Sequence, residues 1–181
     1  MSSASEAATI RQHPDYEPAL QLLRSADLPI SDLTEAHLRH FFYIGSPNAP
    51  VGLVGIEFHG SDALLRSLVV APECRSRGVG TQLVAHAEEY ARDHGAVAVY
   101  LLTNTAERFF RARGYVTASR EYAPVAIKET PEFSSLCPAS SAFLSKRLGV
   151  IPSARRNGGR VSAETLNVKL RAVSLRFCST S

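Results

Sequence analysis

The stretch A-L-L-R-S-L-V-V-A-P-E-C-R-S-R-G-V-G-T, residues 63–81, decides the fold. Its first eight residues, 63–70, are dense in Leu and Val, which predicts a β-strand buried on both faces. Ala71-Pro72 ends the strand, because proline has no N–H to donate to a neighbouring strand. From Thr81 the apolar residues follow a helical spacing. The stretch therefore predicts a strand, a tight glycine turn and a helix.

The turn between this strand and this helix predicts a phosphate-binding site. The first N–H groups of a helix have no acceptor within the helix, and they lie at the positive end of its dipole. Glycines in the turn let an anion approach the backbone, and arginines beside it add positive charge. The residues concerned are Arg75, Arg77, Gly78, Val79, Gly80 and Thr81.

The same turn excludes two common nucleotide loops. A nucleoside-triphosphate loop needs Gly-Lys followed by Ser or Thr, and no Gly-Lys occurs in the chain. A dinucleotide fingerprint needs three spaced glycines after the strand, and only Gly78 and Gly80 are present.

Length and composition fit one domain without a membrane span. The 181 residues are 45% hydrophobic, and no apolar run approaches the ~20 residues that a membrane helix needs. Three cysteines and an N-terminus without a secretory pattern predict a cytoplasmic location. Residues 149–181 hold six basic residues and one acidic residue, which leaves a net charge of −2 for residues 1–148. We expect a disordered segment at 1–7, a domain at 8–148 and a basic flexible extension at 149–181.

Hydrophobic spacing predicts the other elements of the domain. A short helix ending at Leu38 is expected to be capped by Asp32 or Thr34, and a later helix by Asn104 or Thr105. His37 and His40 have no third ligand nearby and are expected on the surface, so no metal site is predicted. Strands are expected at 9–11, 41–44, 51–58, 96–103 and 140–148, and helices at 16–26, from Thr81, at 106–113 and at 123–130. The strand–helix–strand order from 63 to 103 makes its two strands parallel.

A tight connection at residues 59–62 predicts an antiparallel hairpin that brings an acid and a base together. If Phe58 lies opposite Ala63, Glu57 and Arg66 fall diagonally on the same face. Charges on strands that are otherwise apolar are usually paired or functional.

Two motifs resemble those of the GCN5-related N-acetyltransferases. Arg75-x-x-Gly78-x-Gly80 is similar to their acetyl-CoA pyrophosphate loop, Gln/Arg-x-x-Gly-x-Gly/Ala. Residues 103–115, T-N-T-A-E-R-F-F-R-A-R-G-Y, match the family pattern at Ala106, Phe109, Gly114 and Tyr115. The sequences of these motifs, together with P-E-F-x-S-L-C-P-A-S at 131–140, are similar to those of the arsenic-resistance N-acetyltransferases and of relatives that acetylate glutamate-like amino acids.

The resemblance implies a fold and a co-substrate. The fold is the α/β acyltransferase fold, a mixed sheet of six or seven strands with a splayed central strand pair and helices on both faces. The co-substrate is acetyl-CoA, and the splay frees backbone N–H groups near Leu68, Val69 and Val70 for the thioester. Asn104 and Phe110 complete the expected cofactor-binding set. Phe110 stands where many members carry a tyrosine that reprotonates the CoA thiolate. A phenyl ring cannot donate a proton, so the proton comes from water or from another side chain, for which Tyr115, Tyr122 and Cys137 are equal candidates.

We expect direct transfer of acetyl to a small-molecule amine in a ternary complex. Glu57 is the predicted base, because its apolar surroundings should raise its pKa. Arg66, with Ser67, is predicted to bind substrate, since a guanidinium can hold a carboxylate or an arsenic oxyanion. Pairing of Arg66 with Glu57 is expected as well and does not exclude substrate binding, whereas for Glu57 a structural ion pair is the alternative to a catalytic role. The preferred acceptor is a small acidic amino acid or an arsenic- or phosphorus-containing analogue.

Two other functions remain open at this point. One is a CoA-binding regulatory domain without catalysis, which the missing tyrosine at Phe110 suggests. The other is a protein or peptide N-acetyltransferase. No nucleic-acid or membrane partner is predicted, and the protein is expected to be a monomer or a homodimer.

Overall fold

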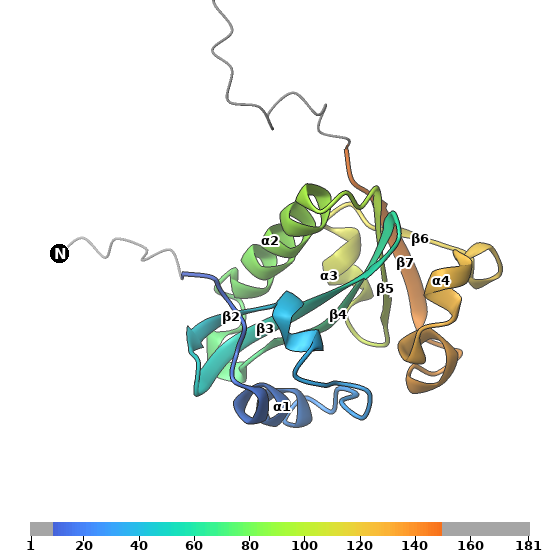
Figure 1. Ribbon diagram of the computed structural model, residues 1–181. Helices are drawn as coiled ribbons and strands as arrows, with labels where there is room; N and C mark the ends of the chain where they lie inside the picture. Colours follow the sequence, from blue (N-terminus) through green and yellow to red (C-terminus); the bar gives the residue numbers. More distant parts are fainter. Residues whose placement is uncertain (1–8, 150–181) are drawn as a thin grey trace, which may run out of the picture. The chain divides into compact units, whose positions relative to one another are not determined.

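The computed structural model describes residues 9–149, which form a seven-stranded mixed sheet with helices on both faces (Figure 1). The strand order is β1-β2-β3-β4-β5-β7-β6. The strands are β1 (Arg11–Gln12), β2 (Phe41–Ser46), β3 (Ala49–His59), β4 (Asp62–Val70), β5 (Ala98–Thr103), β6 (Val116–Thr117) and β7 (Ala142–Arg147). The α-helices are α1 (Tyr16–Arg24), α2 (Val79–Asp93), α3 (Glu107–Arg111) and α4 (Val125–Lys128). Shorter helical turns are η1 (His37–His40), η2 (Pro72–Cys74), η3 (Arg120–Tyr122) and the π-helical η4 (Glu132–Leu136).

The hairpin of β3 and β4 has the predicted register. Phe58 lies opposite Ala63, Glu57 opposite Leu64 and Gly55 opposite Arg66. In β4 the side chains of Ala63, Leu64 and Leu65 are at most 2% exposed, so this strand is buried on both faces. Glu57 and Arg66 therefore lie on one face of the sheet, as predicted.

The central strands β4 and β5 pair for only a short distance. They are parallel, and the paired residues are Asp62 with Ala98, Ala63 with Val99 and Leu64 with Tyr100. Beyond Leu64 no further pair joins the two strands, so the rest of β4 is free of β5. This opening confirms the expected splay.

A bulge in β4 lies just beyond this opening. The register with β3 shifts between the pair Gly55–Arg66 and the pair Leu53–Val69, which leaves one extra residue in β4. Ser67 in this bulge has a φ of 57°, a left-handed value that a residue with a side chain adopts at a cost of roughly 1 kcal/mol or more. Such bulges redirect the side chains of a strand, here next to the opening between β4 and β5.

Alternating residues of the sheet divide the core between the two faces. On one face α2 and α3 cover a core that includes Val54, Ile56 and Leu65. On the other face α1 packs against Leu53 and Val69, whereas α4 joins a separate cluster. The described residues contain no helix long and apolar enough to cross a membrane.

Several boundaries and caps differ from the sequence prediction. The first strand is β1, two residues long, and begins at Arg11 rather than residue 9. Helix α2 begins at Val79, two residues before the expected start, because Gly78 adopts a left-handed φ of 80° and ends the turn. Asp32 and Thr34 do not cap η1, which begins only at His37. Before α3, the hydroxyl of Thr103 accepts the Ala106 N–H at 3.0 Å, in place of a cap by residue 104 or 105. The expected N-terminal segment at 1–7 and, apart from residue 149, the basic extension lie outside the described residues.

We predict that Gly55→Ala destabilises the hairpin. A Cβ atom at Gly55 would lie 2.4 Å from two atoms of the Phe41 ring, and Phe41 is fully buried. Overpacking of this kind costs about 1–3 kcal/mol of the free energy of unfolding, which denaturant titration would measure. The matched control is Gly149→Ala, where the added Cβ would meet no atom within 4 Å. An unchanged free energy of unfolding in Gly55→Ala would contradict this packing.

Candidate active site

Unpaired backbone N–H groups follow the end of β4. Gly78 is the N-cap of α2, and the first α2 residue whose N–H reaches a backbone carbonyl is Gln82, which donates to Gly78 O at 3.0 Å. Within the described residues, the N–H groups of Val79, Gly80 and Thr81 have no backbone acceptor. These residues lie in the turn for which the sequence predicts anion binding, and their N–H groups are available for it.

These N–H groups face a cleft of about 780 Å³. The predicted cofactor residues that line it are Leu68, Val69, Val70, Arg75, Gly78, Val79, Gly80 and Thr81. Arg77 is exposed and does not line the cleft. The cleft is instead lined by Arg113, which follows α3 and which the sequence prediction omitted. Because α3 lies far from this turn along the chain, only the packing of α3 beside α2 reveals Arg113.

A second cavity, of about 530 Å³, adjoins the cleft at the opening between β4 and β5. Both are lined by Leu28, Leu68 and Ala106, so the two spaces are neighbours along β4. Of the predicted site residues, the second cavity is lined by Arg66, Ser67, Leu68, Asn104 and Phe110. The Asn104 side-chain oxygen accepts a hydrogen bond from the Ser141 hydroxyl at 2.6 Å, which holds the wall near β7.

Phe110 lies in the core at the back of this cavity. It is 3% exposed and packs edge-on against Phe109 and Tyr115. Among the three candidates for reprotonating the thiolate, Cys137 lines the cavity, whereas Tyr115 is buried behind Phe110 and Tyr122 is 81% exposed. Burial, reinforced by the nearby Glu132, raises the pKa of the Cys137 thiol. Cys137 is therefore protonated at neutral pH, and it lines the cavity at the opening between β4 and β5.

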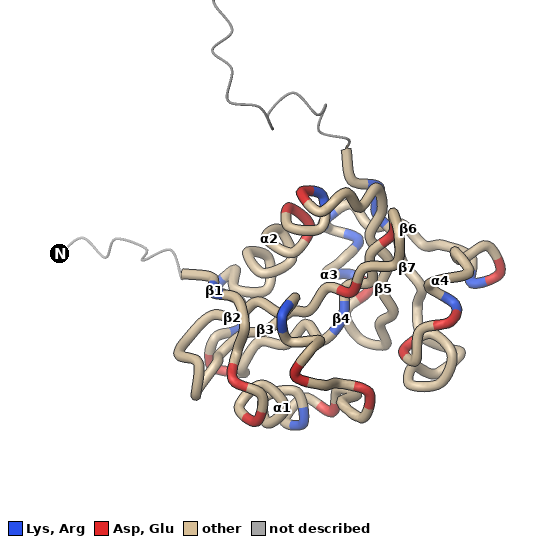
Figure 2. Tube along the Cα trace, in the orientation of Figure 1, with Lys and Arg blue, Asp and Glu red and all other residues tan. Residues whose placement is uncertain are grey.

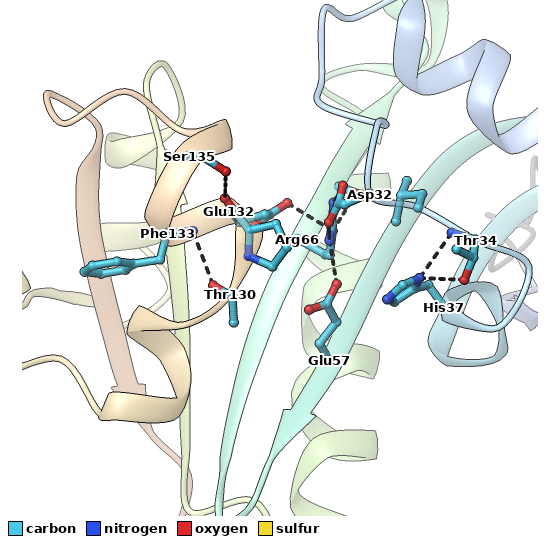
Figure 3. A network of polar contacts seen from close by, with 12 residues as sticks. Asp32, Thr34, His37, Glu57, Arg66, Thr130, Glu132, Phe133 and Ser135 are labelled. Carbon is cyan, nitrogen blue, oxygen red and sulfur yellow. Dashed lines mark hydrogen bonds and ion pairs between the residues drawn. The ribbon is translucent and has the colours of Figure 1, made fainter.

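Arg66 is the centre of a buried cluster with three carboxylates (Figure 3). Its Nη1 donates to Asp32 Oδ2 and to Glu57 Oε1, each at 2.5 Å, and its Nη2 donates to Asp32 Oδ1 at 2.9 Å. Its Nε lies 3.0 Å from Glu132 Oε1 and 3.4 Å from the hydroxyl of Ser67. The Arg66 side chain is 0% exposed. The cluster joins four segments of the chain: the loop after α1, β3, β4 and η4.

The three acids in this cluster differ in their electrostatics. Burial acts to raise the pKa of Asp32, but the hydrogen bond and the charge of Arg66 act more strongly together and leave the pKa of Asp32 below its ordinary value. Burial raises the pKa of Glu132 to about 7, against the lowering effect of Arg66 and with the help of the Glu57 and Asp32 charges. Burial also acts on Arg66 itself, but its acidic partners hold the pKa of the guanidinium above its usual range. Arg66 is therefore always charged, whereas Glu132 titrates near neutral pH.

The contacts of Arg66 bear on both of its predicted roles. The ion pair with Glu57 is confirmed. Four of the five guanidinium N–H groups have a partner, so Arg66 cannot hold a substrate carboxylate with two hydrogen bonds unless an acid moves away. Glu132 is the acid that the arrangement releases most readily, because its pKa is near 7 and it approaches only Nε.

Glu57 lies beside a different cavity from the one between β4 and β5. Its Oε2 is 3.6 Å from His59 Nε2, and both residues line a cavity of about 310 Å³ together with His37 and His40. His40 is half-buried and its Nδ1 is 2.9 Å from the Tyr90 hydroxyl, so it is not a fully exposed surface histidine.

Sequence reasoning missed Asp32 and Glu132 as site residues. Asp32 reads as a helix cap, and its partner Arg66 lies 34 positions further along the chain. Glu132 belongs to the motif P-E-F-x-S-L-C-P-A-S. The distinctive sequence of this motif could have marked Glu132 for attention, although the motif suggests no role by itself.

Acidic residues also gather along α1 and the loop after it (Figure 2).

We predict that Glu132→Gln changes the pH dependence of stability. The pKa of Glu132 is about 7 in the folded protein and 4.5 as the ordinary value, so the folded state holds its proton more tightly. The wild type therefore loses stability as pH rises from about 4.5 to about 7, and Gln, which has no charge, does not. Relative to wild type, the variant should gain about 1–3 kcal/mol in the free energy of unfolding between pH 4.5 and 8. Denaturant titrations across this range measure it, and a constant difference would contradict the prediction.

A family model and a curated relative match the chain in sequence. The model described as "Acetyltransferase (GNAT) family" matches residues 5–115. An uncharacterised N-acetyltransferase of Chlorobaculum tepidum is 35% identical over 89 residues, which are 49% of this chain. The chain covers 57% of that relative's length.

Solved structures of acetyltransferases share the fold. N-acetylglutamate synthase of Neisseria gonorrhoeae, in complex with coenzyme A and N-acetyl-glutamate, superposes with a TM-score of 0.69 at 22% identity. The match covers 81% of this chain and 36% of that protein. An acetyltransferase of the GNAT family from Staphylococcus aureus gives a TM-score of 0.61 at 18% identity, covering 79% of this chain and all (100%) of that one. The matched sequence model, the splayed β4–β5 pair and the glycine turn before α2 agree, and the chain belongs to the acetyltransferase (GNAT) family.

Proposed function

We propose that the protein is an acetyl-CoA-dependent N-acetyltransferase that acetylates the amine of a small molecule. One observation carries the proposal: the cleft lined by the start of α2 and the cavity at the opening between β4 and β5 are neighbours that share the lining residues Leu28, Leu68 and Ala106. Family membership supports the same activity, and coenzyme A is bound in the N-acetylglutamate synthase structure that shares the fold.

The residues of the cleft fit this co-substrate in their chemistry. The N–H groups of Val79, Gly80 and Thr81 would donate to its diphosphate, and Arg75 would add positive charge. Arg75 is held in place by donating from Nε to Val70 O at 2.9 Å. The pantetheine arm would follow β4 past Leu68, with its thioester at the opening between β4 and β5. Backbone N–H groups of β4 that β5 does not use are available to stabilise the charge that develops on the thioester oxygen.

Acetyl transfer also requires a group that takes a proton from the amine. Glu57 is our first candidate, because Arg66 holds its carboxylate in place. Since Glu57 lines the cavity of about 310 Å³ and not the one between β4 and β5, it would take the proton through intervening groups or water. Glu132 is the second, because a pKa of about 7 suits a base at neutral pH and η4 adjoins the cavity through Leu136 and Cys137. Comparing Glu57→Gln with Glu132→Gln in kcat and in its pH profile would separate them. Cys137 is the proposed donor of the proton to the CoA thiolate.

We further propose a small acidic amino acid, or an arsenic- or phosphorus-containing analogue, as the acceptor. The resemblance of the 131–140 motif supports this class. The Nε and Nη2 side of Arg66 would receive the carboxylate once Glu132 moves away, since one Nη2 hydrogen is unused and Glu132 approaches only Nε. The acidic residues along α1 and the following loop would attract the protonated amine (Figure 2).

The test is release of free CoA from acetyl-CoA by the purified protein with a panel of amines, with products identified by mass spectrometry. We expect turnover with acidic amino acids and little with the same amino acids amidated at the side chain. Turnover only on peptides would favour a peptide N-acetyltransferase. CoA binding without turnover on any amine would favour a regulatory domain, and absence of CoA binding would overturn the proposal.

A further inference from the structure

We propose that Arg113 binds a phosphate group of the coenzyme, as the second cation of the cleft beside Arg75. This inference rests on the proposed function and adds a residue that neither the glycine turn nor its neighbouring arginines include. Arg113 and Arg75 both line the cleft that contains the free N–H groups, whereas Arg77 does not.

Two neighbours hold the Arg113 side chain in position. Its Nη1 donates to Phe109 O at 2.5 Å, and its Cζ lies 3.4 Å from the centroid of the Phe109 ring. Its Nη2 donates to the hydroxyl of Thr81 in the first turn of α2. The guanidinium is thus held next to the α2 residues whose N–H groups have no backbone acceptor. An anion could therefore bind there with little loss of conformational entropy in the Arg113 side chain.

Within the described residues, the positive charge of Arg113 has no ion-pair partner and some of its N–H donors are unused. Among the described residues no carboxylate forms an ion pair with it, in contrast to Arg66, Arg24 and Arg111, which each pair with an acid. Its Nε is buried without a hydrogen-bond partner in the described part of the chain, and each Nη uses only one of its two hydrogens. Burial lowers the pKa of Arg113, against the raising effect of the Glu88 charge. An anion in the cleft would accept hydrogen bonds from the unused Nη hydrogens and neutralise the charge.

The arrangement matches a phosphate better than other anions. Two guanidinium groups, each anchored by a backbone carbonyl, line the same cleft as three consecutive N–H groups. Arginine forks and backbone N–H groups are the groups that proteins use for phosphate oxygens. Coenzyme A offers two sources, its diphosphate and its ribose 3′-phosphate.

The experiment compares Arg113→Gln with wild type by calorimetric titration of CoA and of dephospho-CoA, which lacks the 3′-phosphate. Loss of one hydrogen-bonded charge should weaken CoA binding about 10–100-fold. An equal loss with dephospho-CoA would assign Arg113 to the diphosphate, and no loss with dephospho-CoA would assign it to the 3′-phosphate. Arg108→Gln is the control, because it makes the same change at an exposed position of α3, the helix that Arg113 follows, and it should bind CoA like wild type.

Pantetheine, which carries no phosphate, separates binding from a structural role. Pantetheine should inhibit acetyl transfer by the wild type and by Arg113→Gln with the same inhibition constant. Unchanged CoA affinity in Arg113→Gln, or an equal loss of affinity for pantetheine, would overturn the inference and leave the proposed function intact. Should Arg113→Gln fail to fold, Thr81→Val removes the hydroxyl that positions Arg113 and should weaken CoA binding about 3–10-fold. If Thr81→Val folds and binds CoA as tightly as wild type, the inference is wrong. If the wild type itself does not bind CoA, both the inference and the proposed function are wrong.

Discussion

Replacing Arg66 by Met is expected to lower the free energy of unfolding by about 3–5 kcal/mol at pH 8, the usual result of removing one partner from a buried ion pair. The substitution leaves Asp32, Glu57 and Glu132 close together without their cation. Because Arg66 is fully buried, water cannot take over its role. Acetyl transfer should be lost as well, since the cluster holds both candidate bases.

The pH dependence of this effect identifies its cause. In the variant the three carboxylates lack a cation, so they take up protons at higher pH and the destabilisation shrinks as the pH falls. In the wild type, the lowered pKa of Asp32 contributes stability above its ordinary pKa, and this contribution is lost as the pH falls through the folded-state value. Denaturant titrations at pH 8 and 5.5 should therefore show a smaller difference at pH 5.5.

Arg39→Met is the matched control for Arg66→Met, because it removes the same charge at an exposed position. It should change the free energy of unfolding by less than about 0.5 kcal/mol. A loss in Arg66→Met that stayed the same at both pH values would mean that packing, and not charge, explains it.

Replacing Gly80 by Val is expected to weaken CoA binding at least 100-fold, by an order-of-magnitude estimate for blocking a site with a buried side chain. Gly80 lines the cleft, and a Cβ atom there would lie 3.3 Å from Phe109 Cζ and 3.6 Å from Val70 Cγ2. Two further methyl groups would occupy the space in which the phosphate must approach the N–H groups of α2. The proposed co-substrate would then be excluded by sterics alone.

Calorimetric titration with CoA measures this effect, and circular dichroism checks that Gly80→Val is folded. Gly149→Val is the control, since a side chain at Gly149 would meet no neighbour within 4 Å. A folded Gly80→Val protein that binds CoA as tightly as wild type would show that the coenzyme lies elsewhere, and the proposed function would fall.

Local patterns explain why much of the fold was predictable. The hairpin register follows from a short connection and the two-residue period of strands, so Glu57 and Arg66 could be paired from the sequence. The glycine turn before α2 follows from the left-handed φ of 80° at Gly78, which glycine accepts without strain. The bulge at Ser67 was not predictable, because serine does not signal a left-handed backbone.

By itself the sequence determined the order of the strands and helices apart from the two-residue strand β6, the β3–β4 register, the glycine turn before α2 and the family resemblance, because each depends on residues close together in the chain. Only the tertiary structure decided which side chains meet across long distances in sequence. It brought Asp32 and Glu132 to Arg66 and placed Arg113, instead of Arg77, in the cleft. The physical reason is that a buried charge must be neutralised by whatever group the fold brings near it, and no local spacing encodes that partner.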